Sequence, residues 1–86
     1  MIKILYWHRF GKQYKRLPKR LQELVEEKGE LFRKDPFNPA LRTHKLSGKL
    51  EGRWAFSVNY SLRVIFWFED PQTALFYSIG NHDIYN

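Results

Sequence analysis

The fold of this chain is decided by residues 54–68, which read WAFSVNYSLRVIFWF. From Trp54 to Tyr60, large apolar residues alternate with small or polar ones. This period of two predicts a half-buried strand, because successive side chains of a strand point to opposite faces. Residues 62–68 are apolar on both faces except at Arg63, which predicts a central strand.

Turn signals extend this sheet toward the C-terminus. The tetrapeptide Glu69-Asp70-Pro71-Gln72 predicts a turn, because these residue types favour tight reversals of the backbone. Residues 73–79 then predict a last strand, which Gly80 ends. Short turns make consecutive strands antiparallel neighbours, so we expect the sheet to be mainly antiparallel.

Upstream of residue 54 the pattern is helical. After an apolar run at residues 2–7, predicted as a first strand, apolar residues recur at helical spacing from Phe10 to Leu17 and from Leu21 to Phe32. Pro18 predicts a break between two helices, and Asp35-Pro36 ends the second one. The predicted fold is α+β, with two N-terminal helices packed on one face of a small, mainly antiparallel sheet of four to five strands, in the order β-α-α-β-β-β.

The composition limits the class of protein. Eighty-six residues predict a single domain over residues 1–86, and 43% hydrophobic content with 17% aromatic residues is enough to form a core. The sequence has no cysteine and no apolar run of about 18 residues, so we expect a cytoplasmic protein without a membrane span. The net charge of +6 favours a polyanionic partner, either nucleic acid or a strongly acidic protein. The alternative is a soluble protein that is merely basic.

Arg63 is the first candidate for chemistry. An arginine in an otherwise apolar central strand is expensive to bury unless it is paired or used. One interpretation is a salt bridge to Glu51, Glu69 or Asp83 that stabilises the sheet. The other is a phosphate clamp, to which the planar guanidinium is suited.

Two histidines lie at the ends of the C-terminal half. His44 lies in a basic cluster before Ser47-Gly48, and His82 follows the last predicted strand. A neutral imidazole accepts a proton near pH 7 and an imidazolium donates one. Attack of an RNA 2′-hydroxyl on the adjacent phosphate needs this pair of roles and positive charge, without a metal or cofactor. His8 is interpreted as a surface or packing residue.

Aromatic and basic residues complete the predicted RNA site. Tyr85 is a candidate for stacking on a base, whereas Trp54 is interpreted as core because it starts the apolar stripe. Basic residues near the helix junction either contact the RNA backbone or solvate the helices. The residues that we expect to bind RNA are Arg42, Lys45, Lys49, Arg53, Lys12, Lys15 and Arg16.

Four segments in this order resemble the RelE/ParE superfamily, the toxins of bacterial and archaeal type II toxin–antitoxin pairs. They are DPFNP at 35–39, RTHKLSGKLEGRWAFSV at 42–58, LRVIFWF at 62–68 and IGNHDIY at 79–85. The resemblance covers nearly the whole chain and is nearest to the YafQ-like branch of mRNA interferases. It implies a RelE-like fold, ribosome-dependent cleavage of mRNA in the decoding site, an acidic antitoxin as partner, and operator DNA binding through that antitoxin.

The resemblance also implies roles for single residues. His44 matches the position of a catalytic histidine and would act as general base. Arg63 would stabilise the pentavalent phosphate, His82 would act as general acid, and Tyr85 would hold the substrate.

The sequence departs from the YafQ-like pattern at two positions. Ser57 and Ser61 stand where that branch has a further histidine and an aspartate. Two alternatives therefore stay open, a ParE-like inhibitor of DNA gyrase that poisons by protein binding, and an inactive homologue that acts only in an antitoxin complex. The presence of both His44 and His82 favours the ribonuclease.

Overall fold

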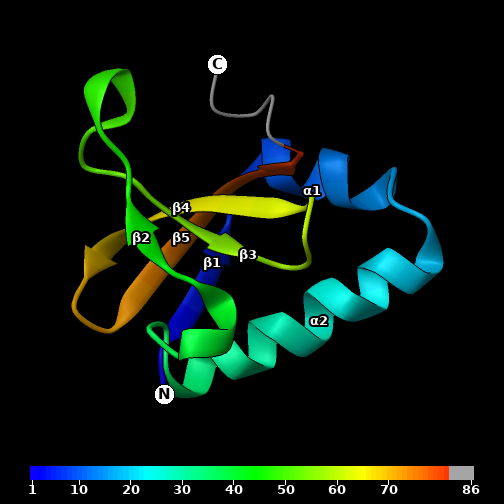
Figure 1. Cartoon of the computed structure of the whole chain (residues 1–86), viewed down its shortest axis with the longest axis horizontal. Coiled ribbons are helices and arrows are strands. Elements are labelled where there is room, and N and C mark those ends of the chain that lie inside the picture. Colours follow the sequence, from blue (N-terminus) through cyan, green and yellow to red (C-terminus); the bar gives the residue numbers. More distant parts are fainter. Residues whose placement is uncertain (82–86) are drawn as a thin grey trace.

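The computed structural model describes residues 1–81 (Figure 1). His82, Asp83 and Tyr85, to which the sequence assigned a role or a contact, lie outside the described residues. The elements in chain order are β1 (Lys3–Tyr6), α1 (His8–Lys15), α2 (Lys19–Lys34), the 3-10 turn η1 (Pro39–Leu41), β2 (His44–Lys45), the 3-10 turn η2 (Gly48–Leu50), β3 (Trp54–Ser57), β4 (Arg63–Asp70) and β5 (Thr73–Gly80).

The strands form one sheet in the order β1-β5-β4-β3-β2. Neighbours from β2 to β5 are antiparallel, and only β1 pairs in parallel, with β5. A parallel pair needs a crossover connection, which here includes both helices. The predicted α+β class and the mainly antiparallel sheet are confirmed, and the fifth strand is the two-residue β2, which the sequence pattern did not predict.

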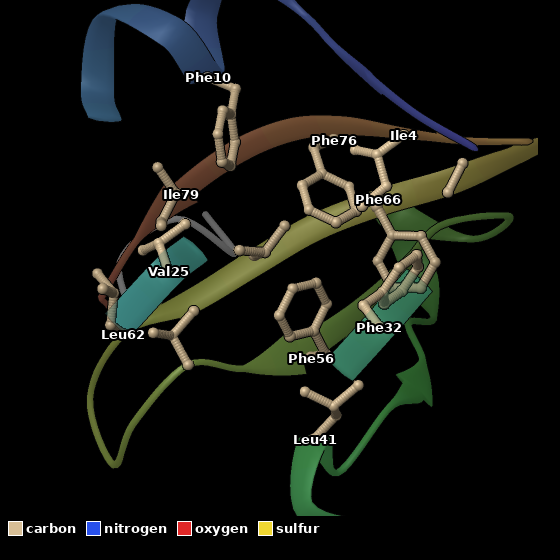
Figure 2. Packing of buried hydrophobic residues seen from close by; sticks show 13 residues of the cluster. Ile4, Phe10, Val25, Phe32, Leu41, Phe56, Leu62, Phe66, Phe76 and Ile79 are labelled. Atoms are coloured by element: carbon tan, nitrogen blue, oxygen red, sulfur yellow. The ribbon is translucent and has the colours of Figure 1, made fainter. Parts of the chain in front are cut away.

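The core lies between α2 and one face of the sheet. Phe56, Phe66 and Phe76 come from three adjacent strands and point to the same side, where Phe32 of α2 lies (Figure 2). The ring centroid of Phe32 is 5.2, 4.9 and 5.1 Å from those of the three strand residues. Its exposed fraction is 0%. Buried rings of this size dominate the energetics of a small core.

A β-bulge adjusts β5 to this packing. Phe66 of β4 pairs with Phe76, but the preceding residue Ile65 pairs with Ser78. Tyr77 is therefore extra on β5, and a bulge of this kind shifts the side-chain alternation of its strand by one residue. The pairing is non-local, so the regular alternation in the sequence did not reveal it.

Helix α1 has two roles, because it contributes Phe10 to the core and also covers the edge of the sheet. Strand β1 pairs only with residues 73–76 of β5. Beyond them, the Ile79 amide donates to Oε1 of Gln13 in α1 at 2.8 Å. The unpaired edge of a strand exposes backbone donors. The Gln13 side chain supplies an acceptor for this part of β5, where β1 no longer pairs with it.

The two helices are joined by polar contacts across the predicted break at Pro18, which is confirmed. The Tyr14 hydroxyl donates to Oε2 of Glu26 at 2.7 Å, and this hydrogen bond raises the pKa of Tyr14 to about 12. Nε2 of Gln22 donates to the Tyr14 carbonyl at 2.9 Å. Within residues 1–81, no helix is long and apolar enough to cross a membrane.

One detail of the strand prediction was wrong. Strand β3 ends at Ser57 and does not continue to Tyr60, whose exposed fraction is 91%. The Oδ1 atom of Asn59 accepts from the amides of Ser61 at 3.0 Å and Leu62 at 2.7 Å. An asparagine that bonds to the backbone two residues on is a turn signal, and it removes Tyr60 from the buried stripe.

We expect Phe32→Ala to lower the free energy of unfolding by about 3–5 kcal/mol, because it leaves a cavity among three strands. Phe37→Ala is the matched control, since Phe37 is 53% exposed. Urea unfolding of both variants gives the comparison. Equal losses would mean that the core is not centred on Phe32.

Candidate functional site

The sheet has a second face, opposite the one that packs on α2. Because side chains alternate along a strand, the residues between the core phenylalanines point away from the helix. We call this the distal face. Its residues on β2, β3 and β4 and directly before β3 include His44, Arg53, Ala55, Ser57, Arg63, Ile65 and Trp67.

A pocket of about 330 Å³ lies at one end of the sheet. Ser57 pairs with Arg63 there, and Arg63 in turn pairs with Gly80 at the end of β5. The residues that line the pocket are Lys28, Ala40, Arg42, Ser57, Val58, Asn59, Tyr60 and Arg63. Among residues 1–81, three of the lining residues are cations and none is a carboxylate, so this lining suits an anion such as a phosphate.

Arg63 is half-buried, and its Nη1 donates to the carbonyl of Asn59 at 2.7 Å. Neither Glu51 nor Glu69 pairs with it, and the third expected partner, Asp83, lies outside the described residues. The only ion pair within residues 1–81 joins two residues of α2. Within residues 1–81, the salt-bridge interpretation of Arg63 thus finds neither Glu51 nor Glu69 as a partner.

His44 is exposed on β2, and its Nδ1 lies 2.9 Å from the carbonyl oxygen of Arg42. A carbonyl only accepts hydrogen bonds, so Nδ1 carries the proton and the neutral ring keeps its lone pair on Nε2. Arg42 has φ 53° and ψ 40°, a left-handed conformation that is uncommon outside glycine. This conformation ends η1 directly before the short strand that carries His44.

The distal face therefore brings together only part of the predicted site. His44 pairs with Ala55 of β3. Ser57, which pairs with Arg63 in the pocket, is two residues further along the same strand. His44 is therefore displaced from the pocket by two residues along β3. It does not line the pocket itself. Ser61 lies in the turn after Asn59, away from the paired strands.

The other basic residues are spread over three places. Lys45 lies on the helical side of β2, with Nζ 5.5 Å from the ring centroid of Trp54. Trp54 packs against the core as expected. Lys49 is exposed in η2, and Lys15 is exposed at the end of α1. Lys12 and Arg16 line a shallow groove of about 320 Å³ on α1, with His8, Arg9 and Gln13.

Sequence reasoning missed three polar residues of the pocket, Lys28, Asn59 and Tyr60. Lys28 was read as part of the solvated face of the second helix, because nothing local shows that the helix passes the β3–β4 turn. Asn59 and Tyr60 belong to that turn, and the Asn-x-Ser-Leu spacing was the available signal for it.

The fold resembles several solved toxin structures over almost its whole length. YafQ from E. coli superposes with a TM-score of 0.80 at 18% identity, covering 99% of this chain and 98% of YafQ. The YoeB/ParE toxin from Agrobacterium tumefaciens gives 0.78 at 16% identity, covering 94% and 99%. A chain of the E. coli DinJ–YafQ toxin–antitoxin complex gives 0.77 at 20% identity, covering 96% and 94%.

This chain has the RelE/ParE toxin fold. The resemblance noted in the sequence is thus confirmed at the level of the fold. No protein-family model and no curated protein sequence matches the chain. These structures are 16–20% identical to the chain, and at that level the similarity shows the fold alone.

The tautomer of His44 gives a direct test of the site geometry. We expect its neutral ring to carry the proton on Nδ1, because the Arg42 carbonyl accepts from that atom. Imidazole nitrogen chemical shifts in an NMR spectrum of the neutral form distinguish the two tautomers. A dominant Nε2-protonated form, which is the usual one in free histidine peptides, would contradict the hydrogen bond.

Proposed function

We propose that this chain is the toxin of a type II toxin–antitoxin pair, and that it is a metal-independent endoribonuclease that cleaves mRNA on the ribosome. The observation that carries the proposal is the cationic pocket around Arg63, with His44 beside it on the same face of a RelE/ParE fold. Fold alone does not decide activity, so the argument depends on what these side chains do.

The proposed reaction begins with proton transfer to Nε2 of His44 from a ribose 2′-hydroxyl. The 2′-oxygen attacks the adjacent phosphorus, and the negative charge of the pentavalent phosphate is stabilised by the guanidinium groups of Arg63 and Arg42. The bond from phosphorus to the 5′-oxygen then breaks, and that oxygen receives a proton. The products are a 2′,3′-cyclic phosphate and a 5′-hydroxyl end.

The proton donor in this scheme is His82, and Tyr85 holds the substrate. These two assignments come from the sequence and its resemblance to the superfamily, since both residues lie outside the described part of the chain. A base and an acid at separate positions match the two proton transfers of the reaction.

The proposed partner is an acidic antitoxin, which the net charge of +6 favours. Solved structures with this fold include the DinJ–YafQ complex from E. coli and a YoeB–YefM complex from Staphylococcus aureus. By analogy, the complex would bind operator DNA through the antitoxin.

We expect induction of the wild-type chain to arrest bacterial growth and to cut mRNA. In purified translation reactions, the cleaved mRNA should carry 2′,3′-cyclic phosphate and 5′-hydroxyl ends. Arg63→Ala should lower the cleavage rate by about 10²–10³-fold, through loss of transition-state stabilisation. His44→Ala should lower it by about 10²–10⁴-fold, through loss of the general base. Mapping of the 5′ ends of mRNA measures both.

Arg33→Ala is the matched control, because Arg33 lies on α2, where it pairs with Glu30 at 3.3 Å. It should cleave like the wild type. Full activity of Arg63→Ala and His44→Ala would refute the assigned chemistry. Growth arrest with intact mRNA and induced DNA damage signalling would instead identify a gyrase inhibitor, and no growth arrest at all would identify an inactive homologue.

A further inference from the structure

A second group of cations lies on the distal face, away from the pocket. Cζ of Arg53 lies 5.0 Å from the ring centroid of Trp67 and 5.4 Å from that of Tyr77. Cζ of Arg9, in α1, lies 5.3 Å from the same Tyr77 ring, and its Nη1 donates to the Tyr77 hydroxyl at 2.9 Å. The two rings are 5.3 Å apart. We call these four residues the Arg–aromatic cluster.

The cluster shares a face with the phosphate pocket. Trp67 is four residues from Arg63 on β4, so both side chains point to the same side, about 13 Å apart along the strand. The register places Arg53 opposite Trp67, directly before β3. Buried Ala55 and Ile65 lie between the two groups. The distal face thus has a cationic site at each end and an apolar floor between them.

Neither arginine of the cluster forms an ion pair within residues 1–81, where the one ion pair lies on α2. The nearby Glu69 accepts from Nε1 of Trp67 at 2.9 Å and fixes that ring. Nε of Arg53 is buried and has no hydrogen-bond partner among the described residues. A buried donor without an acceptor is costly.

A guanidinium stacked on aromatic rings keeps its in-plane donors available for a phosphate or a base edge. Aromatic rings bind nucleobases by stacking, and arginine adds a cation–π contribution. An acidic peptide would use the two arginines but not the paired rings, so the combination of Trp67 and Tyr77 with Arg53 favours a nucleotide.

We propose that the Arg–aromatic cluster binds one nucleotide of single-stranded RNA, a few positions from the phosphate held at Arg63. The inference rests on the proposed function, since it assigns a second contact to the same substrate. The distal face would then contact the RNA at two places, the Arg–aromatic cluster and the pocket at Arg63. Cleavage would take place at Arg63.

The test measures binding of a fluorescently labelled RNA whose 2′-hydroxyls are methylated, so that it cannot be cut. Arg53→Ala and Trp67→Leu should each weaken its affinity by about tenfold to hundredfold, the range for loss of one stacked base. Arg53→Lys, which keeps the charge but loses the planar fork, should weaken it less than Arg53→Ala. Arg33→Ala and Phe37→Leu, an arginine and an aromatic residue outside the distal face, should bind like the wild type. Urea unfolding confirms that each variant is folded.

A series of RNAs with a single abasic nucleotide locates the contact. The wild type should lose affinity at one position away from the scissile phosphate, and Arg53→Ala and Trp67→Leu should be insensitive at that position. Wild-type affinity in both variants, or equal loss at every abasic position, would overturn the proposal. Arg53-dependent binding of polyglutamate in place of RNA would overturn it as well.

The same variants separate this inference from the proposed function. If the wild type cleaves mRNA, and Arg53→Ala and Trp67→Leu cleave it equally fast and bind RNA equally tightly, the proposed role of the cluster is refuted. The proposed nuclease activity then stands. Position-specific RNA binding through the cluster without any cleavage refutes the nuclease and supports the cluster.

Discussion

The structure depends on the packing of one α2 ring, Phe32, against phenylalanines from three neighbouring strands. This contact determines which face of the sheet is buried under the helix. Because the side chains of a strand alternate, it also determines which residues of β3 and β4 are left on the distal face. A slip of one residue in β4 would bury Arg63 in the core and expose Phe66. The apolar packing therefore positions the polar residues without contacting them.

The distal face then combines charge and geometry in a way that the helical face does not. Arg42 and Arg63 line one pocket, and no carboxylate of residues 1–81 is part of its lining. His44 is held by a backbone carbonyl with its free nitrogen on Nε2. Arg53 is stacked on aromatic rings at the other end. Concentrating cations on a single face costs stability through self-repulsion, and binding of the proposed polyanionic substrate would offset that cost.

The sequence predicted the parts of this fold that depend on local patterns. Alternation around Phe56 predicted a strand, helical spacing predicted both helices, and Pro18 predicted the break between them. The parts that depend on distant partners were not predictable in this way. The bulge at Tyr77 arises from pairing with β4, and the two-residue strand at His44 exists only because β3 lies beside it. The turn at Asn59 had a local signal that the alternating pattern obscured.

The central claim is that RNA binds to the distal face. The most direct test is a titration of isotope-labelled protein with a 2′-methylated single-stranded RNA, followed by NMR. The account predicts that the largest shifts of backbone and side-chain signals occur at residues such as Ser57, Arg63 and Trp67, and that exposed residues of α2 away from Lys28, such as Glu23, are unchanged. Shifts confined to the helices, with the distal face unaffected, would contradict it.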